Sequence, residues 1–103
     1  LLKTNAGIES AVIFGSIARK EETSRSDIDL LIVVNALSNK KKVEDSLSGL
    51  SESIAQNFQT VISPCILTAN QFRKKHREKS PLINEILKSY ILILGKSPER
   101  IIV

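Results

Sequence analysis

The chain has 103 residues, of which 42% are hydrophobic and 25% charged, and its formal net charge is +4. A chain of this length can close one hydrophobic core but has no room for two, so we expect a single domain over residues 1–103. The longest apolar runs, LLIVV and YILILG, fall far short of the roughly 20 residues that cross a bilayer, and a single cysteine cannot form an internal disulfide. These features exclude a membrane-spanning helix and a disulfide scaffold, and they favour a soluble cytoplasmic domain without a membrane partner.

Two apolar segments in the first third of the chain predict the core of a sheet. Residues 11–14, AVIF, form a short buried strand that is closed by Gly15. Residues 27–34, DIDLLIVV, are apolar without alternation after the aspartates, which is typical of a central strand covered on both faces. Between the two strands, Ser16 can cap a short helix over residues 17–22.

The middle of the chain predicts one long helix and a third strand. Over residues 39–58 the apolar side chains recur at spacings of three and four, which indicates an amphipathic helix. Residues 60–68, TVISPCILT, then read as a strand. Pro64 places this strand at an edge or marks a bulge, because proline cannot donate a hydrogen bond to the ladder.

The last third predicts two helices and a final apolar segment. Residues 69–79 form the first helix, and residues 80–89 form the second, with Ser80 as its cap and Pro81 in its first turn. Residues 90–95, YILILG, are either a last strand or part of an apolar tail. The order of elements predicts an α+β (α/β) fold, a small mixed sheet with helices packed on it.

The basic cluster RKKHREK at residues 73–79 is a candidate for binding an anion. No aromatic side chain lies between its charges, and the net charge is modest for a nucleic-acid-binding protein. We therefore interpret the cluster, with His76, as a solvated helix face, and a surface for nucleic acid or a partner is the alternative.

The first ten residues, LLKTNAGIES, contain no initiator methionine, no basic leader and no cleavage site. We expect them to belong to a longer chain. An upstream domain is left open, and nucleic acid would be a partner only through such a domain.

Two aspartates one residue apart begin the second strand. Residues i and i+2 of a strand point to the same face, so Asp27 and Asp29 have Cα atoms roughly 6.5 to 7 Å apart. A divalent metal between the two carboxylates would relieve their repulsion, and Mg²⁺ prefers such hard oxygen ligands together with phosphate oxygens. The alternative is structural: Asp27 bonds to the local turn, and Asp29 pairs with Arg19 or Arg25.

The preceding strand ends in Gly15-Ser16, directly before the predicted short helix. Glycine lets the backbone approach a bulky ligand, and the N–H groups at a helix start attract phosphate. If the two strands are neighbours, a phosphate-binding turn lies beside a metal-binding carboxylate pair. That combination suits nucleotidyl transfer.

These residues resemble the minimal nucleotidyltransferases of the DNA polymerase β-like superfamily. The family motif is Gly-Ser, ten residues and Asp-x-Asp, and here the positions in register are Phe14, Gly15, Ser16, Ala18, Arg19, Ser26, Asp27, Asp29 and Leu30. The resemblance implies the nucleotidyltransferase fold, Mg²⁺ bound by Asp27 and Asp29, and an NTP, with ATP as the first choice. It also implies that the Gly15-Ser16 turn holds the phosphates, and Arg19 is a further candidate for a phosphate contact.

The chain departs from the family at one position. Active members usually carry a third carboxylate on a following strand, whereas the predicted strand over residues 60–68 contains no acid. Cys65, or Ser63 on the same face, is expected to stand in its place. Neither side chain is a good base for a hydroxyl group.

Three hypotheses follow from the motif and its missing acid. The first is a nucleotidyltransferase that moves a nucleoside monophosphate to a hydroxyl of a protein or small molecule. Within this hypothesis, the resemblance implies an antitoxin that modifies a helical toxin. The second is a catalytically silent nucleotide-binding module, with a DNA-binding domain upstream left open. The third is a protein-interaction domain with structural aspartates. A homo-oligomer is compatible with all three.

Overall fold

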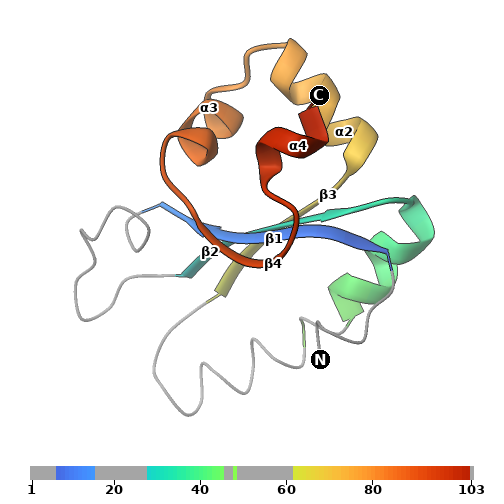
Figure 1. Cartoon of the computed structure of the whole chain (residues 1–103). Helices are drawn as coiled ribbons and strands as arrows, with labels where there is room; N and C mark the ends of the chain where they lie inside the picture. The colour runs from blue at the N-terminus through green and yellow to red at the C-terminus, as the bar shows by residue number, and fades with distance from the viewer. Residues whose placement is uncertain (1–6, 16–27, 46–47, 49–61, 103) are drawn as a thin grey trace.

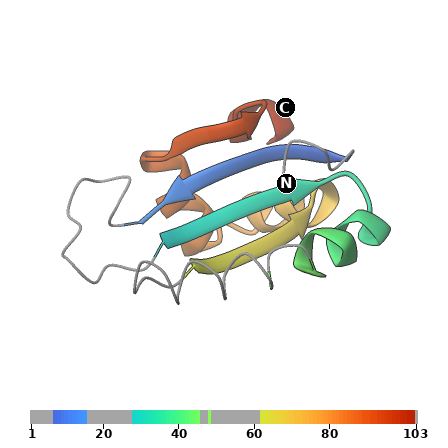
Figure 2. The ribbon, with the colours of Figure 1, turned by 90° about the horizontal axis from the view of Figure 1, so that it is seen from below.

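A four-stranded sheet lies at the centre of the molecule, with helices on both of its faces (Figure 1). The computed structural model describes residues 7–15, 28–45, 48 and 62–102. The strands stand in the order β3-β2-β1-β4, and Figure 2 shows them side by side from below. Their bounds are Ile8–Phe14 for β1, Ile28–Val34 for β2, Ile62–Thr68 for β3 and Ile91–Gly95 for β4.

The sheet is mixed, which agrees with the predicted fold class. β1 runs antiparallel to both β2 and β4, whereas β2 and β3 are parallel. Residues 30–34 of β2 are all buried, because this strand has a neighbour on each side and packed side chains on each face. The unbroken apolar run in the sequence indicated this central position.

The helices that follow β3 cover the upper face of the sheet in Figure 1, and a helix between β2 and β3 lies on the lower face. The upper helices are α2 (Ala69–Arg77), α3 (Pro81–Lys88) and α4 (Pro98–Ile102). The lower helix is described over residues 37–45 and at residue 48. Its Val43 side chain is 1% exposed and packs in the core beneath the sheet.

The two faces of the sheet carry separate hydrophobic cores. The upper core joins β1, β2 and β3 to the three helices; its members are Val12, Phe14, Leu31, Val33, Leu67, Ala69, Phe72, Ile83, Ile86 and Ile101. The lower core consists of Ala11, Leu30, Ile32, Val34, Val43, Ile62 and Ile66. In β2 the residues alternate strictly between the two cores, as the period of a strand requires.

Local sequence explains where α2 and α3 begin. The hydroxyl of Thr68 accepts a hydrogen bond from the backbone N–H of Gln71 at 3.1 Å, and the Gln71 side chain accepts from the N–H of Thr68 at 2.9 Å. This capping box satisfies two N–H groups that the helix would otherwise leave without partners. α3 begins at Pro81, whose missing N–H costs nothing in a first turn.

Most predicted elements are confirmed, with shifted ends. β1 begins at Ile8, before the predicted residue 11, because its first residues pair with β2 and β4. The lower helix begins at residue 37, before the predicted residue 39. α2 ends at Arg77, and two residues later Lys79 has a φ of 57°, a left-handed conformation that ends a helix.

Some predictions about the termini of elements need correction or fall outside the described residues. Ser80 stands at the N-cap of α3, but its side chain makes no capping hydrogen bond. Its backbone carbonyl accepts from the N–H of Asn84 at 3.1 Å instead. The predicted helix over residues 17–22 and most of residues 46–61 lie outside the part of the chain that the structure describes.

The C-terminal apolar segment divides into a strand and a helix. Residues 91–95 pair with β1 as an edge strand, and Ile91, Leu92 and Ile93 remain 43–49% exposed. α4 was not predicted, although Pro98 and Glu99 are favourable in a first turn. Ile101 is fully buried in the upper core, so this end of the chain packs internally. None of the helices in the described parts is long and apolar enough to cross a membrane.

Candidate active site

Asp29 and Gly15 meet where β1 ends and β2 begins. Phe14, the last residue of β1, pairs with Asp29, and Gly15 follows with a φ of +77°. A Cβ atom at residue 15 would lie 3.1 Å from Asp29 Cγ and closer still to Asp29 Oδ2. The carboxylate therefore occupies the space that any other residue at position 15 would need. Both the left-handed backbone and this close approach require glycine.

The Asp29 side chain lies on the upper face of the sheet. It shares a face of β2 with Leu31 and Val33, two and four residues further on, which belong to the upper core. The carboxylate is half-buried. It is therefore on the same face as α2, α3 and α4 and at the end of the sheet next to the glycine turn. Metal binding by this carboxylate stays a prediction.

The register of β3 shows which residue of that strand lies beside Asp29. In the parallel pair of β2 and β3, Asp29 is opposite Ser63, and Leu31 is opposite Cys65. Ser63 shares the upper face with Cys65, since the two are separated by one residue. The position beside Asp29 is thus held by a hydroxyl group, and Cys65 lies one pair further into the sheet.

Cys65 behaves as a half-buried apolar residue. Burial raises the pKa of its thiol, and the positive charges of Lys75 and Lys40 offset only part of that rise. The thiol packs against the upper core. A protonated thiol is a poor base and a poor nucleophile, so Cys65 does not replace the missing carboxylate chemically.

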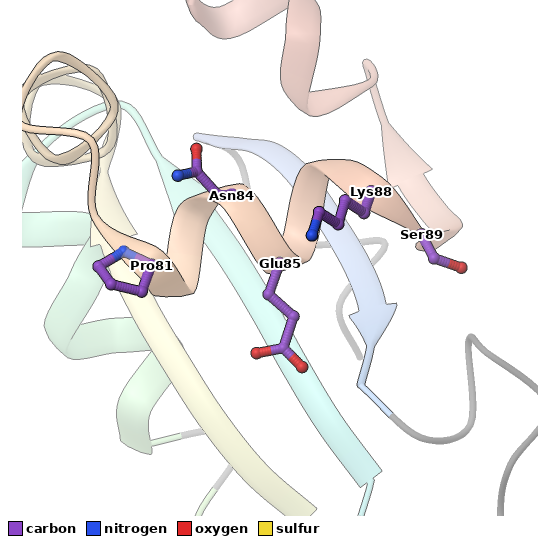
Figure 3. A pocket seen from close by; sticks show the side chains of 5 residues that line it. All are labelled: Pro81, Asn84, Glu85, Lys88 and Ser89. Carbon is purple, nitrogen blue, oxygen red and sulfur yellow. The ribbon is translucent and has the colours of Figure 1, made fainter.

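A cavity of about 490 Å³ runs along α3, on the opposite side of that helix from its buried Ile83 and Ile86 (Figure 3). The side chains that line it are Pro81, Asn84, Glu85, Lys88 and Ser89. Sequence reasoning missed this cavity. The polar residues that line it recur at spacings of three and four in the sequence, but this pattern ordinarily marks the solvated face of a helix and does not indicate a cavity.

The end of the cavity at Ser89 lies near the glycine turn. Ile91 of β4 pairs with Ile13 of β1 in antiparallel register. Ser89 precedes this pair by two residues and Gly15 follows it by two, so both lie at the same end of the β1–β4 pair. The C-terminal end of α3 and Gly15 therefore lie at the same end of the sheet, while the cavity itself is on the side of α3 that faces away from the sheet.

The other predicted site residues are not placed by the structure. Asp27, Ser16 and Arg19 lie outside the described residues. Within the described ranges, no three His, Cys, Asp or Glu side chains gather where they could hold a metal ion. Asp29 by itself fits Mg²⁺ in chemistry, because a carboxylate is a hard oxygen ligand.

The basic cluster at residues 73–79 is in part exposed, as predicted, and in part bonded within the fold, which was not predicted. The guanidinium of Arg73 donates to the carbonyl of Ile101 at 2.7 Å and to Asn70 Oδ1 at 3.1 Å. Lys74 and Lys75 line a smaller cavity of about 240 Å³ together with Glu78. This cavity is separate from the one along α3.

Comparisons with known proteins agree with this geometry. Two solved structures have similar folds, and each aligns over 98% of this chain and 74% of the other chain. One is a toxin–antitoxin with AMP-PNP, at 14% identity and a TM-score of 0.55. The other is a mutant of the toxin–antitoxin MntA–HpeT, at 12% identity and a TM-score of 0.51. At these identities the likeness shows a shared fold. A search of curated proteins finds no significant match. Residues 1–99 match the family model described as polymerase beta, nucleotidyltransferase. The chain belongs to this nucleotidyltransferase family.

Proposed function

We propose that the domain transfers a nucleoside monophosphate from an NTP, with ATP as the first candidate, to a hydroxyl group of an acceptor protein or small molecule. The observation that supports this most is the close approach of the Asp29 carboxylate to Gly15. It joins the two halves of the family motif, the phosphate turn and the acidic strand, at one point in space.

The roles of the individual residues follow from the motif and its chemistry. Asp27 and Asp29 hold Mg²⁺, which when bound would stabilise negative charge on the phosphates. The turn at Gly15 and Ser16 binds phosphate through backbone N–H groups, and Arg19 adds a positive charge. The acceptor oxygen attacks the α-phosphorus, the bond from that phosphorus to the bridging oxygen breaks, and pyrophosphate leaves. The proton of the acceptor hydroxyl passes to a base or to water.

A partner protein is the proposed acceptor. The two structural neighbours are toxin–antitoxin complexes, one of them crystallised with AMP-PNP. By analogy, this domain acts as an antitoxin in the cytoplasm and modifies a helical toxin. A small-molecule acceptor remains the alternative for the same site, since a hydroxyl group is the only chemical requirement.

One observation favours a second function, a nucleotide-binding module without catalysis, with or without an attached DNA-binding domain. Ser63 is opposite Asp29 in the pair of β2 and β3, and β3 carries no carboxylate that could serve as a base. General-base catalysis contributes about 10² to 10⁴ in rate, so its loss would leave a slow enzyme or a binding protein. Phosphate and metal binding need only the residues that the chain retains.

The test has two stages, binding and transfer. Each of the four NTPs is titrated calorimetrically into the wild type and into the Asp27→Asn/Asp29→Asn variant, with and without Mg²⁺. We expect an NTP to bind the wild type only when Mg²⁺ is present, and to lose most of its affinity for the variant. Equal binding to both proteins would exclude the aspartates as the metal site.

Transfer is then followed by pyrophosphate release and by mass spectrometry of the acceptor; any small helical protein found to be encoded beside this gene is the first acceptor to test. An acceptor heavier by one nucleoside monophosphate supports the enzyme. Tight magnesium-dependent NTP binding without pyrophosphate release, with that protein or with small hydroxyl compounds, supports the silent module.

A further inference from the structure

The edge strand β4 carries an apolar surface that the described fold does not bury. Within the described ranges four large apolar side chains are exposed, and three of them are consecutive in β4: Ile91, Leu92 and Ile93, at 43–49%. Residues 90–95 contain neither a charged residue nor a proline. The described sheet ends at β4, as Figure 2 shows, so this strand has a neighbour on one side only. Such an edge is a template for pairing with another strand.

The other edge of the described sheet is protected against pairing. β3 contains Pro64, which is exposed and cannot donate to a ladder. Burial raises the pKa of the Cys65 thiol in this strand, and the charges of Lys75 on α2 and Lys40 on the lower helix counteract the rise. Cations therefore flank β3 from both faces of the sheet. Proline and lysine are the usual residues that block an edge, and residues 90–95 contain neither of them.

We propose that two copies of the domain pair antiparallel through β4, so that their two four-stranded sheets become continuous. A two-fold axis makes this contact self-complementary, since each copy offers the strand that the other copy needs. A second copy fits this edge better than the helical acceptor of the proposed function, because a helix bonds its own backbone internally and offers no strand. The pairing does not depend on the chemistry of nucleotidyl transfer.

The charges at the two ends of β4 are compatible with this pairing. Lys96, directly after the strand, forms an ion pair with Glu9 of β1 at 2.9 Å. At the other end, the hydroxyl of Tyr90 donates a hydrogen bond to the Glu99 carboxylate of α4 at 2.5 Å. In an antiparallel pair the start of one strand lies beside the end of the other strand. Lys96 of one copy therefore comes to the end at which the second copy has Glu99.

The short length of β4 sets the expected strength of the contact. The strand has five residues, and Ile93 is an extra residue between the pairs Val12–Leu92 and Ala11–Leu94, so it forms a bulge. A bulge bends the strand and interrupts its ladder. Interfaces below about 1,200 Å² are typically weak, and we expect a dissociation constant on the order of 100 µM. The assembly should close at two copies, because β3 offers no second free edge.

The first test is sedimentation velocity of the chain from about 5 to 500 µM, a range that brackets the expected dissociation constant. We expect a monomer at the low end, mostly dimer at the high end, and no larger species. Ile93→Lys places like charges near the two-fold axis and removes an apolar contact, so it should raise the dissociation constant about tenfold or more. The matched control is Leu37→Lys on the lower helix, where Leu37 is 67% exposed, and it should leave the dissociation constant unchanged.

Three results of this experiment would overturn the proposal. They are a monomer throughout the range, assemblies larger than a dimer, and equal dissociation constants in Ile93→Lys and Leu37→Lys. Because Ile93 is exposed, Ile93→Lys is expected to fold, and its circular dichroism spectrum checks this. If lysine disturbs β4, Ile93→Thr keeps the β-branched shape and is the second variant, again with weaker association expected.

The second test distinguishes strand pairing from simple packing of apolar side chains. Pairing places the outward amides of β4 in hydrogen bonds, so hydrogen exchange over residues 91–95 should slow about twofold or more at high protein concentration. Exchange in α2 should not change with concentration. A dimer without slower exchange in β4 would exclude the continuous sheet. Magnesium ATP binding is measured in the same variants and should be unaffected by Ile93→Lys, so a failure of the proposed function is recorded separately.

Discussion

Asp29 and Ser63 stand opposite each other in the parallel pair of β2 and β3. Neighbouring strands lie about 4.8 Å apart, so a carboxylate at position 63 would share a metal ion with Asp29 without any change of backbone. The chain carries a serine at this position, and β3 has no carboxylate at any of its seven residues.

Ser63→Asp is therefore expected to restore a base to the site. If the enzyme is slow because this acid is missing, the rate of pyrophosphate release in the presence of Mg²⁺ should rise by about 10²-fold. Cys65→Asp is the control: it adds a carboxylate opposite Leu31, half-buried against the upper core, and is expected to lower stability without raising the rate. An unchanged rate in Ser63→Asp with intact NTP binding would show that residue 63 does not face the reacting groups.

Gly15→Ala should damage both stability and nucleotide binding. The new Cβ would collide with the Asp29 carboxylate, and the φ of +77° costs about 1–2 kcal/mol for a residue with a side chain. Gly95→Ala is a matched control, because Gly95 has a φ of +78° and its Cβ would meet the backbone of Glu9, away from the site. Thermal unfolding should show a loss in both variants, whereas calorimetry should show weaker NTP binding only for Gly15→Ala. Normal NTP affinity in Gly15→Ala would contradict the role of this turn.

Ile101→Ala tests whether α4 belongs to the core of the domain. Its side chain is fully buried among the residues of the upper core, so truncation should cost about 2–5 kcal/mol of unfolding free energy. Ile93→Ala, at an exposed position of β4, should cost no more than about 1 kcal/mol. Urea unfolding followed by circular dichroism measures both. A small loss for Ile101→Ala would mean that α4 detaches readily from α2.

Alkylation of Cys65 provides a pH-dependent prediction. Burial raises the pKa of this thiol, so the thiolate fraction of the folded protein at pH 8 is lower than that of a free cysteine. Iodoacetamide should thus react more slowly with the folded protein than with the protein unfolded in urea. The rate for the folded protein should also go on rising with pH beyond the usual pKa range of a thiol before it levels off.

The same shift bears on stability. Burial raises the pKa of Cys65 in the folded state above its value in the unfolded state. The contribution of the neutral thiol to the free energy of unfolding is therefore fully present below the unfolded-state pKa and is lost as the pH rises through the folded-state pKa. Lys75 lowers the pKa of Cys65, so Lys75→Gln should raise it further and slow alkylation again. Rapid alkylation of folded wild-type protein at pH 7 would contradict the burial of the thiol.

The sequence by itself determined the strands and the acidic motif. β2 was predictable because a short, unbroken run of apolar and β-branched residues indicates a buried strand. The spacing from Gly15 to Asp29 indicated the family without any knowledge of contacts. α2 was predictable because its capping residues, Thr68 and Gln71, are close in sequence. All of these signals depend on neighbours along the chain.

Only the tertiary structure decided which residues stand side by side. Whether Ser63 or Cys65 faces Asp29 depends on the register of a parallel pair whose strands are joined through a long connection, and a shift of two residues keeps the same face and the same periodicity. The register of β4 on β1 was needed to place the C-terminal end of α3 at the same end of the sheet as Gly15. The place of α4 was settled by the space left for Ile101 in the upper core. Register and packing arise from contacts between distant segments, and periodicity along the chain carries no information about them.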